Sequence, residues 1–97
     1  KYMTLDPYAD KWRAFGWNVI EVEDGNDMEQ IVRAFDSLPD PKGDVPTVVV
    51  CNTIKGKGVS FMEKKLGWHS GCLGYDDMEK ALAEVEAAWE AEKKEMN

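Results

Sequence analysis

Residues 46–71 read PTVVVCNTIKGKGVSFMEKKLGWHSG, and they open with a continuous apolar run over residues 47–52. This run is rich in β-branched side chains and lacks polar alternation, which predicts a strand that is covered on both faces. Such strands lie in parallel sheets with helices on either side. Because ligands of these sheets bind beyond the carboxyl ends of the strands, we expect a binding site in the loop that follows.

The residues before this stretch predict a helix and a strand. Apolar side chains recur at helical spacing over residues 8–15, with Asp6 as the expected N-cap and Pro7 in the first turn. Residues 18–22 form a short β-branched run between turn-forming residues, which predicts a strand.

Two further amphipathic helices complete the predicted order of elements. One covers residues 28–38 with Asn26 as its expected cap, and the other covers residues 75–97 with Asp76 as its expected cap. Because two strands alone do not form a stable sheet, the pattern predicts an α/β fold that is the edge portion of a parallel sheet flanked by helices. We interpret residues 1–97 as a single partial domain.

The loop over residues 53–74 carries the candidate chemistry. Lys55 and Lys57 alternate with Gly56 and Gly58, and this pattern suits an anion, since glycines let backbone N–H groups approach and the ammonium groups supply charge. A tight surface turn with two solvated lysines is the alternative. The length of the irregular segment favours a functional loop.

His69 is the only histidine, and it follows Trp68 near the end of the same loop. A lone histidine is more often a packed or surface residue, so composition alone does not assign it a role. Within a phosphate-binding loop its imidazole would be suited to proton transfer.

Composition excludes several classes of protein. With a net charge of -7 and a pI near 4.6, the chain has no basic surface for nucleic acid or anionic lipid. It has no apolar run long enough to span a membrane and no leader sequence, so we expect a cytoplasmic protein. Cys51 and Cys72 are expected to be free thiols, and no zinc site is expected. The start at Lys1 suggests that further residues precede the chain.

Taken together, these motifs resemble the transketolase family. Residues 46–71 are similar to the family segment in which a strand precedes a KG(K/R)G loop, an ME turn and a WHG element. The resemblance extends back through DPYADKWRAFGWNVIEVEDGND, residues 6–27, and is closest to the split, two-subunit transketolases. It implies the C-terminal part of the N-terminal, diphosphate-binding subunit.

The resemblance also implies roles for individual residues. Lys55 and His69 correspond to the lysine and histidine that face the cofactor diphosphate and the sugar substrate, which makes His69 the candidate catalytic residue. Ile54 corresponds to an apolar residue beside the thiazolium ring, and Gly56 belongs to the same cofactor loop. Ser70 follows His69 where the family usually has glycine, so the position of His69 is open.

The family's activity is the transfer of a two-carbon ketol unit between sugar phosphates with thiamine diphosphate and Mg²⁺. The family's Gly-Asp-Gly metal signature has no counterpart in this chain, so no metal ligand is assigned and the chain alone is not expected to be catalytic. The implied partners are the remaining segments or subunits of the enzyme and a sugar phosphate, in an oligomer.

Three alternatives stay open. The chain could be a fragment of another thiamine diphosphate enzyme or a free-standing phosphate-binding domain. It could also be a non-catalytic α/β scaffold or interaction module whose four tryptophans, Trp12, Trp17, Trp68 and Trp89, pack a core or a partner. Exposed tryptophans would favour an interface.

Overall fold

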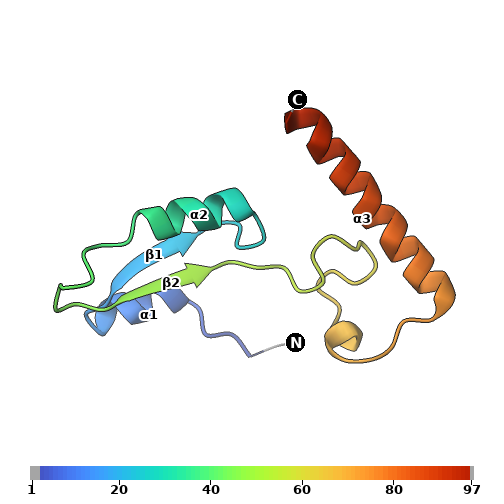
Figure 1. Ribbon diagram of the computed structural model, residues 1–97. Coiled ribbons are helices and arrows are strands. Elements are labelled where there is room, and N and C mark those ends of the chain that lie inside the picture. Colours follow the sequence, from blue (N-terminus) through green and yellow to red (C-terminus); the bar gives the residue numbers. More distant parts are fainter. Residues whose placement is uncertain (1–2, 97) are drawn as a thin grey trace. The chain divides into compact units, whose positions relative to one another are not determined.

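The computed structural model describes residues 3–96. Its elements follow one another as α1 (Tyr8–Ala14), β1 (Asn18–Val22), α2 (Met28–Asp36), β2 (Thr47–Cys51), the short 3-10 helix η1 (Leu66–His69) and α3 (Tyr75–Met96) (Figure 1). The contacts divide the chain into two compact units, with the division between Thr53 and Ile54. The single partial domain over residues 1–97 stays a prediction. The predicted terminal helix is confirmed as far as Met96, and Asn97 lies outside the described residues.

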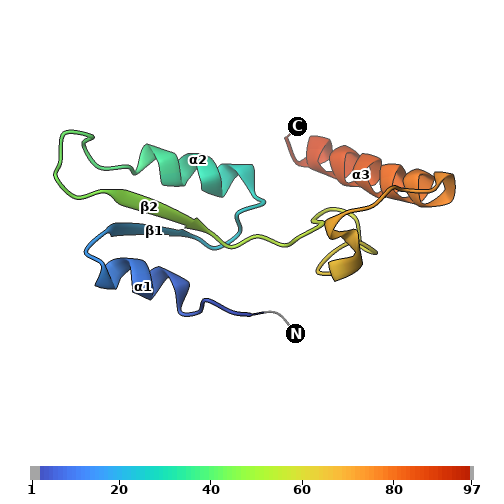
Figure 2. The same cartoon turned by 90° about the horizontal axis from the view of Figure 1, so that it is seen from below.

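The first unit is a two-stranded parallel sheet between two helices. Asn18 of β1 pairs with Thr47 of β2, and the register continues to the pair of Val22 and Cys51. Helices α1 and α2 lie on opposite faces of the two strands (Figure 2). This arrangement confirms the predicted α/β fold, in which parallel strands are flanked by helices.

Small residues form the core of this unit. Side chains of a strand alternate between its faces, so Val22 lies beside Ala34 of α2 and Val50 lies beside Ala9 of α1. All four of these residues are buried. Elsewhere in β2, Thr47, Val48 and Val49 are half-buried and Cys51 is exposed, because both helices contact β1 most extensively. The strand was predicted to be covered on both faces, but within β2 only Val50 is buried.

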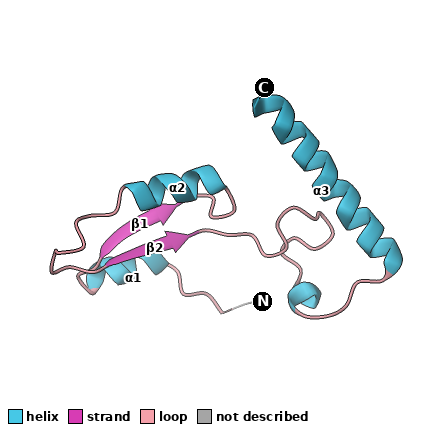
Figure 3. Cartoon of the chain, in the orientation of Figure 1, coloured by secondary structure: helices cyan, strands magenta, loops and turns pink. Residues whose placement is uncertain are grey.

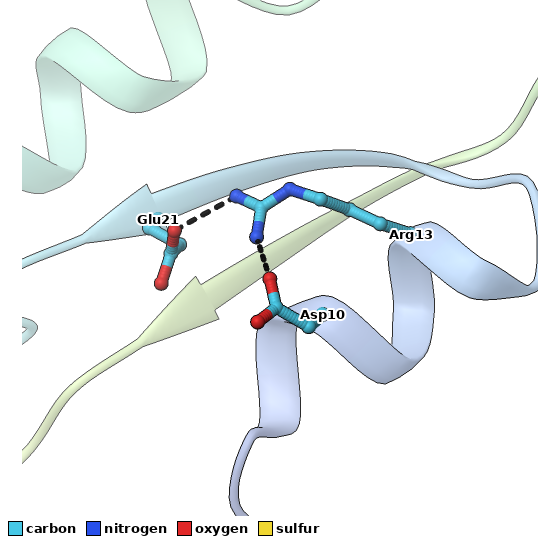
Figure 4. Close-up of polar contacts among 3 residues, drawn as sticks. All are labelled: Asp10, Arg13 and Glu21. Carbon is cyan, nitrogen blue, oxygen red and sulfur yellow. Dashed lines mark hydrogen bonds and ion pairs between the residues drawn. The ribbon is translucent and has the colours of Figure 1, made fainter.

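An arginine joins α1 to β1 (Figure 4). The Arg13 guanidinium lies 2.7 Å from the Asp10 carboxylate and 2.8 Å from the Glu21 carboxylate. These hydrogen bonds, that to Glu21 above all, raise the pKa of Arg13 above its ordinary value. Because all three side chains are exposed, the contact contributes little to the stability of the fold.

The first two helix caps differ from the predicted ones. Helix α1 begins at Tyr8 with Pro7 at the N-cap position and no side-chain cap, so the prediction of Asp6 was wrong. Asp27, not Asn26, caps α2 by accepting a hydrogen bond from the Glu29 N–H at 3.0 Å. Asn26 instead donates its backbone N–H to the side chain of Asp24 at 3.0 Å, and so belongs to the preceding turn.

Helix α3 begins two residues earlier than a cap at Asp76 allows. Its first residue is Tyr75, and the Met78 N–H donates to the Gly74 carbonyl at 2.9 Å. Asp76 therefore lies inside the first turn and not at the cap, where its carboxylate still complements the helix dipole.

A glycine turn holds the carboxyl end of β2. The Gly25 N–H donates to the Asn52 carbonyl at 2.7 Å, and a Cβ atom at Gly25 would lie 2.7 Å from the Cys51 Cβ. Real Cβ atoms do not approach so closely, so only glycine fits this turn. The turn fixes the position from which the chain leaves the sheet.

Candidate functional site

The candidate site is the loop over residues 54–65 together with the short helix η1, both in the second unit. Figure 3 shows this segment as loop, interrupted only by the turn of η1. Residues 60–64 form a turn, and the helical turn η1 that follows was not predicted. The loop closes on itself where the Lys64 N–H donates to the Lys55 carbonyl at 2.9 Å.

Gly56 lies where the two sides of the loop meet. Its φ angle is 76°, in the left-handed region, and an added Cβ would lie 2.6 Å from the Met62 carbonyl oxygen. Both facts require glycine. The residue is therefore needed for the closed shape of the loop, while its predicted place beside the cofactor stays a prediction.

The backbone N–H groups of the KGKG segment point largely within the loop. The Lys57 N–H donates to the Ile54 carbonyl at 3.1 Å, and the Gly58 N–H donates to the Glu63 carboxylate at 3.2 Å. A carboxylate in this place repels phosphate, so the Gly58 N–H does not serve as the expected anion donor. Glu63 therefore has a structural role in this turn.

One carbonyl connects Lys55 to the helical turn that carries His69. The Lys55 ammonium donates to the Lys65 carbonyl at 2.6 Å, and the Trp68 N–H donates to the same oxygen at 3.2 Å. Lys65 is the N-cap of η1, and His69 is its last residue. The side chain of Lys55 thus contacts the start of the helical turn that carries His69. Its ammonium group has two further N–H donors available for an anion.

An aromatic pair supports the turn that carries His69. The Phe61 and Trp68 rings meet edge to face with centroids 5.9 Å apart, and both side chains are half-buried. His69 itself is exposed. Ser70 follows in an extended conformation and Gly71 has a φ of 139°, so the extra serine is accommodated after η1 and leaves His69 within it.

A contact with α3 was not predicted from the sequence. Ser60 donates its backbone N–H and its hydroxyl to the two carboxylate oxygens of Glu84, at 2.6 Å and 2.5 Å. These hydrogen bonds, that from the hydroxyl above all, lower the pKa of Glu84. The residues are 24 positions apart, and no motif signals the pairing of a loop serine with one glutamate of a glutamate-rich helix.

The donors of this site fit a diphosphate better than they fit a metal ion. The loop offers the Lys55 ammonium and the exposed imidazole of His69, which suit phosphate oxygens. Among residues 3–96, no three side chains of the His, Cys, Asp or Glu type gather in a way that could hold a metal ion. The described residues therefore do not fit Mg²⁺.

Two further features concern the cysteines and the apolar character of the helices. Cys51 and Cys72 are free thiols, as expected, and both are exposed, which was not predicted. In the part of the chain that the structure describes, no helix has the length and apolar character needed to cross a membrane.

Residues 1–95 match the family model described as "Transketolase, thiamine diphosphate binding domain". The chain belongs to the transketolase family. Its α/β fold is accordingly part of the thiamine diphosphate binding domain of a transketolase. The resemblance stated from the sequence is confirmed.

The curated relatives to which this transketolase chain is similar include subunits of split transketolases. It is 41% identical over 95 residues to an apulose-4-phosphate transketolase subunit of Phocaeicola vulgatus, a match that covers 98% of the chain and 33% of the relative. It is 44% identical over 82 residues to the 6-deoxy-6-sulfo-D-fructose transketolase subunit SqwG of a Clostridium species, covering 84% of the chain and 29% of the relative. Human transketolase is 31% identical over 90 residues, covering 93% of the chain and 14% of that protein. The chain thus spans about a third or less of the relatives it matches.

Proposed function

We propose that this chain supplies the cofactor loop of a split transketolase, which transfers a two-carbon ketol unit between sugar phosphates. The observation that carries the proposal is the Lys65 carbonyl, which holds the Lys55 ammonium against the start of the turn that bears His69. This contact brings the Lys55 ammonium to the N-cap of η1, the turn that carries the His69 imidazole. The family match adds that the domain binds thiamine diphosphate.

Each residue of the loop has a proposed task. Lys55 donates its two remaining N–H groups to diphosphate oxygens, and Ile54, which is half-buried, provides an apolar contact for the thiazolium ring. His69 donates an imidazole N–H to the diphosphate or to the carbonyl oxygen of the sugar. Gly56 keeps the loop closed. Bound thiamine diphosphate supplies the nucleophilic carbon that carries the two-carbon unit.

The remaining parts of the proposed enzyme come from elsewhere. Two similar proteins are named as transketolase subunits, so we propose that this chain acts with further segments of its own domain and with a partner subunit. Those further segments would hold Mg²⁺, because the described residues offer no metal cluster. We propose that the chain is inactive by itself. The sugar phosphate substrate and the cytoplasmic location stay predictions.

Calorimetric titration of thiamine diphosphate and Mg²⁺ tests this function. The chain would be combined with the remaining transketolase segments, and ketol transfer would be followed in the same sample. We expect binding and turnover in the complex and neither in the chain alone. Lys55→Ala should weaken binding about tenfold or more, because it removes a charge-assisted hydrogen bond to the diphosphate. His69→Ala should reduce turnover more than binding.

Lys94→Ala is the matched control. Lys94 is an exposed lysine of α3, so its replacement removes the same charge away from the loop and should leave both readouts unchanged. Equal binding by the Lys55→Ala, His69→Ala and Lys94→Ala complexes would show that the loop does not contact the cofactor.

Exposed apolar side chains support a second role for this chain, which is binding to other parts of the enzyme. Trp17 and Trp89 are 36% and 51% exposed, and α3 presents a stripe of exposed apolar side chains, Met78, Leu82, Val85 and Trp89. Such a stripe on a helix is typical of a surface that another part of an assembly covers. We propose that the remaining segments of the transketolase cover it.

A further inference from the structure

Ser60 and Glu84 form the contact that connects the candidate loop to α3. Both oxygens of the Glu84 carboxylate accept hydrogen bonds from Ser60, one from the backbone N–H at 2.6 Å and one from the hydroxyl at 2.5 Å. Two parallel, charge-assisted bonds fix orientation as well as distance. A single side chain of the helix therefore determines where this point of the loop lies.

Ser60, the residue that Glu84 binds, lies close in sequence to the hydrogen bonds that shape the loop. Ser60 lies between Gly58 and Glu63, which are themselves joined by a hydrogen bond of 3.2 Å. After Glu63 the chain continues to Lys65, whose carbonyl accepts a hydrogen bond from the Lys55 ammonium at 2.6 Å. A shift of Ser60 is thus transmitted through one further hydrogen bond to the segment that orients Lys55.

The helix is a suitable anchor because it is long and regular. Helix α3 spans 22 residues, and Glu84 lies near its middle, away from the ends where helices fray. The loop has turn-type backbone hydrogen bonds but no helix or strand within residues 54–65, and loops are generally less stable than regular elements. An external anchor reduces the conformational freedom that the loop loses when a ligand binds.

We propose that Glu84 is a positioning residue for the cofactor loop and that it acts through Ser60. The proposal rests on the proposed function, because it assigns Glu84 the task of holding the loop in the shape that binds the diphosphate. Glu84 does not touch the cofactor. Its contribution is to the affinity for thiamine diphosphate and not to the chemical step.

The test compares variants of both residues in the complex with the remaining transketolase segments. Glu84→Ala should weaken thiamine diphosphate binding about fivefold, the scale expected for the loss of a modest positioning contact, with kcat nearly unchanged at saturating cofactor. Ser60→Ala removes the hydroxyl bond and should weaken binding less. Ser60→Thr keeps both donors and should bind as the unsubstituted chain does. The double variant S60A/E84A should bind no more weakly than Glu84→Ala alone.

Glu86→Ala is the control on the same helix, since it removes an equal charge at an exposed position two residues away. Equal affinity for the cofactor in Glu84→Ala and Glu86→Ala would overturn the proposal. So would a loss of kcat and thermal stability in Glu84→Ala with unchanged affinity, because that pattern indicates a purely structural helix contact. If the unsubstituted complex binds no thiamine diphosphate, the proposed function itself is wrong, and this outcome is distinct from the other two.

Discussion

Hydrogen bonds within a few residues determine the shape of the candidate loop. Lys55 makes two of them, one from its ammonium to the Lys65 carbonyl at 2.6 Å and one from the Lys64 N–H to its own carbonyl at 2.9 Å. Gly56 allows the close approach that these bonds require. The loop is therefore preorganised by its own backbone, which lowers the entropic cost of binding a ligand.

Replacing Gly56 should open the loop. Gly56→Ala puts a Cβ atom 2.6 Å from the Met62 carbonyl oxygen at a positive φ of 76°, and we expect it to destabilise the unit by about 1–3 kcal/mol. Limited proteolysis and hydrogen exchange of residues 54–65 would report the change. Gly67→Ala is the matched control, because no atom lies within 4 Å of an added Cβ there. Equal protection of the loop in both variants would contradict the packing role of Gly56.

The carboxyl group of Glu84 should titrate below its ordinary pKa of 4.5, because Ser60 donates two hydrogen bonds to the charged form. A lowered pKa means that the contact stabilises the folded chain fully above pH 4.5 and loses this contribution as the pH falls through the lower, folded value. Carbon-detected NMR of the carboxyl group would measure the midpoint. Ser60→Ala should raise it.

Ser37→Ala serves as the control for that titration. The Ser37 hydroxyl donates to the Ala34 carbonyl at 2.8 Å in α2, so its removal should leave the Glu84 midpoint unchanged. A midpoint that is the same in the unsubstituted, Ser60→Ala and Ser37→Ala chains would show that the contact does not persist in solution.

Among the elements, the strands were the easiest to predict and the helix starts the hardest. Residues 18–22 were predicted as a strand and form β1, because a β-branched run between turn residues has few alternatives. The cap of α2 was misplaced by one residue, since Asn26 and Asp27 are both good caps and only the Asx turn at Asp24 separates them.

The loop between β2 and α3 was predicted to carry chemistry, yet its internal contacts were not predictable. The oxygen that binds Lys55 is a backbone carbonyl, which every residue possesses. Glu84 is one of many glutamates on α3, and only the folded chain shows which of them reaches Ser60. Residue types and order therefore predict which loop carries the candidate site, whereas tertiary contacts determine the geometry of that loop.

At the scale of the whole molecule, the buried core is small for the apolar residues present. Between Met3 and Met96, the buried apolar residues are Ala9, Val22, Ala34, Val50 and Ala81, while many large apolar side chains are exposed. A chain of this size with so little buried area has marginal stability. The chain also spans only a third or less of its relatives. Both facts agree with a chain that gains stability by packing against other segments of a transketolase.

Assembly with the remaining transketolase segments should therefore protect α3. We expect slower hydrogen exchange at the stripe of Met78, Leu82, Val85 and Trp89, because burying its apolar side chains stabilises the helix. Hydrogen-exchange mass spectrometry of the chain before and after assembly would measure this. Protection that rises elsewhere but not in α3 would show that the stripe is not covered in the complex.

The position of Lys55 relative to the bound cofactor is the central claim. A crystal structure of the assembled complex with thiamine diphosphate measures it most directly. We expect the Lys55 Nζ within hydrogen-bond distance, about 2.7–3.2 Å, of a diphosphate oxygen. A diphosphate bound elsewhere, with the Lys55 ammonium donating only to the Lys65 carbonyl, would contradict the proposed role of this loop.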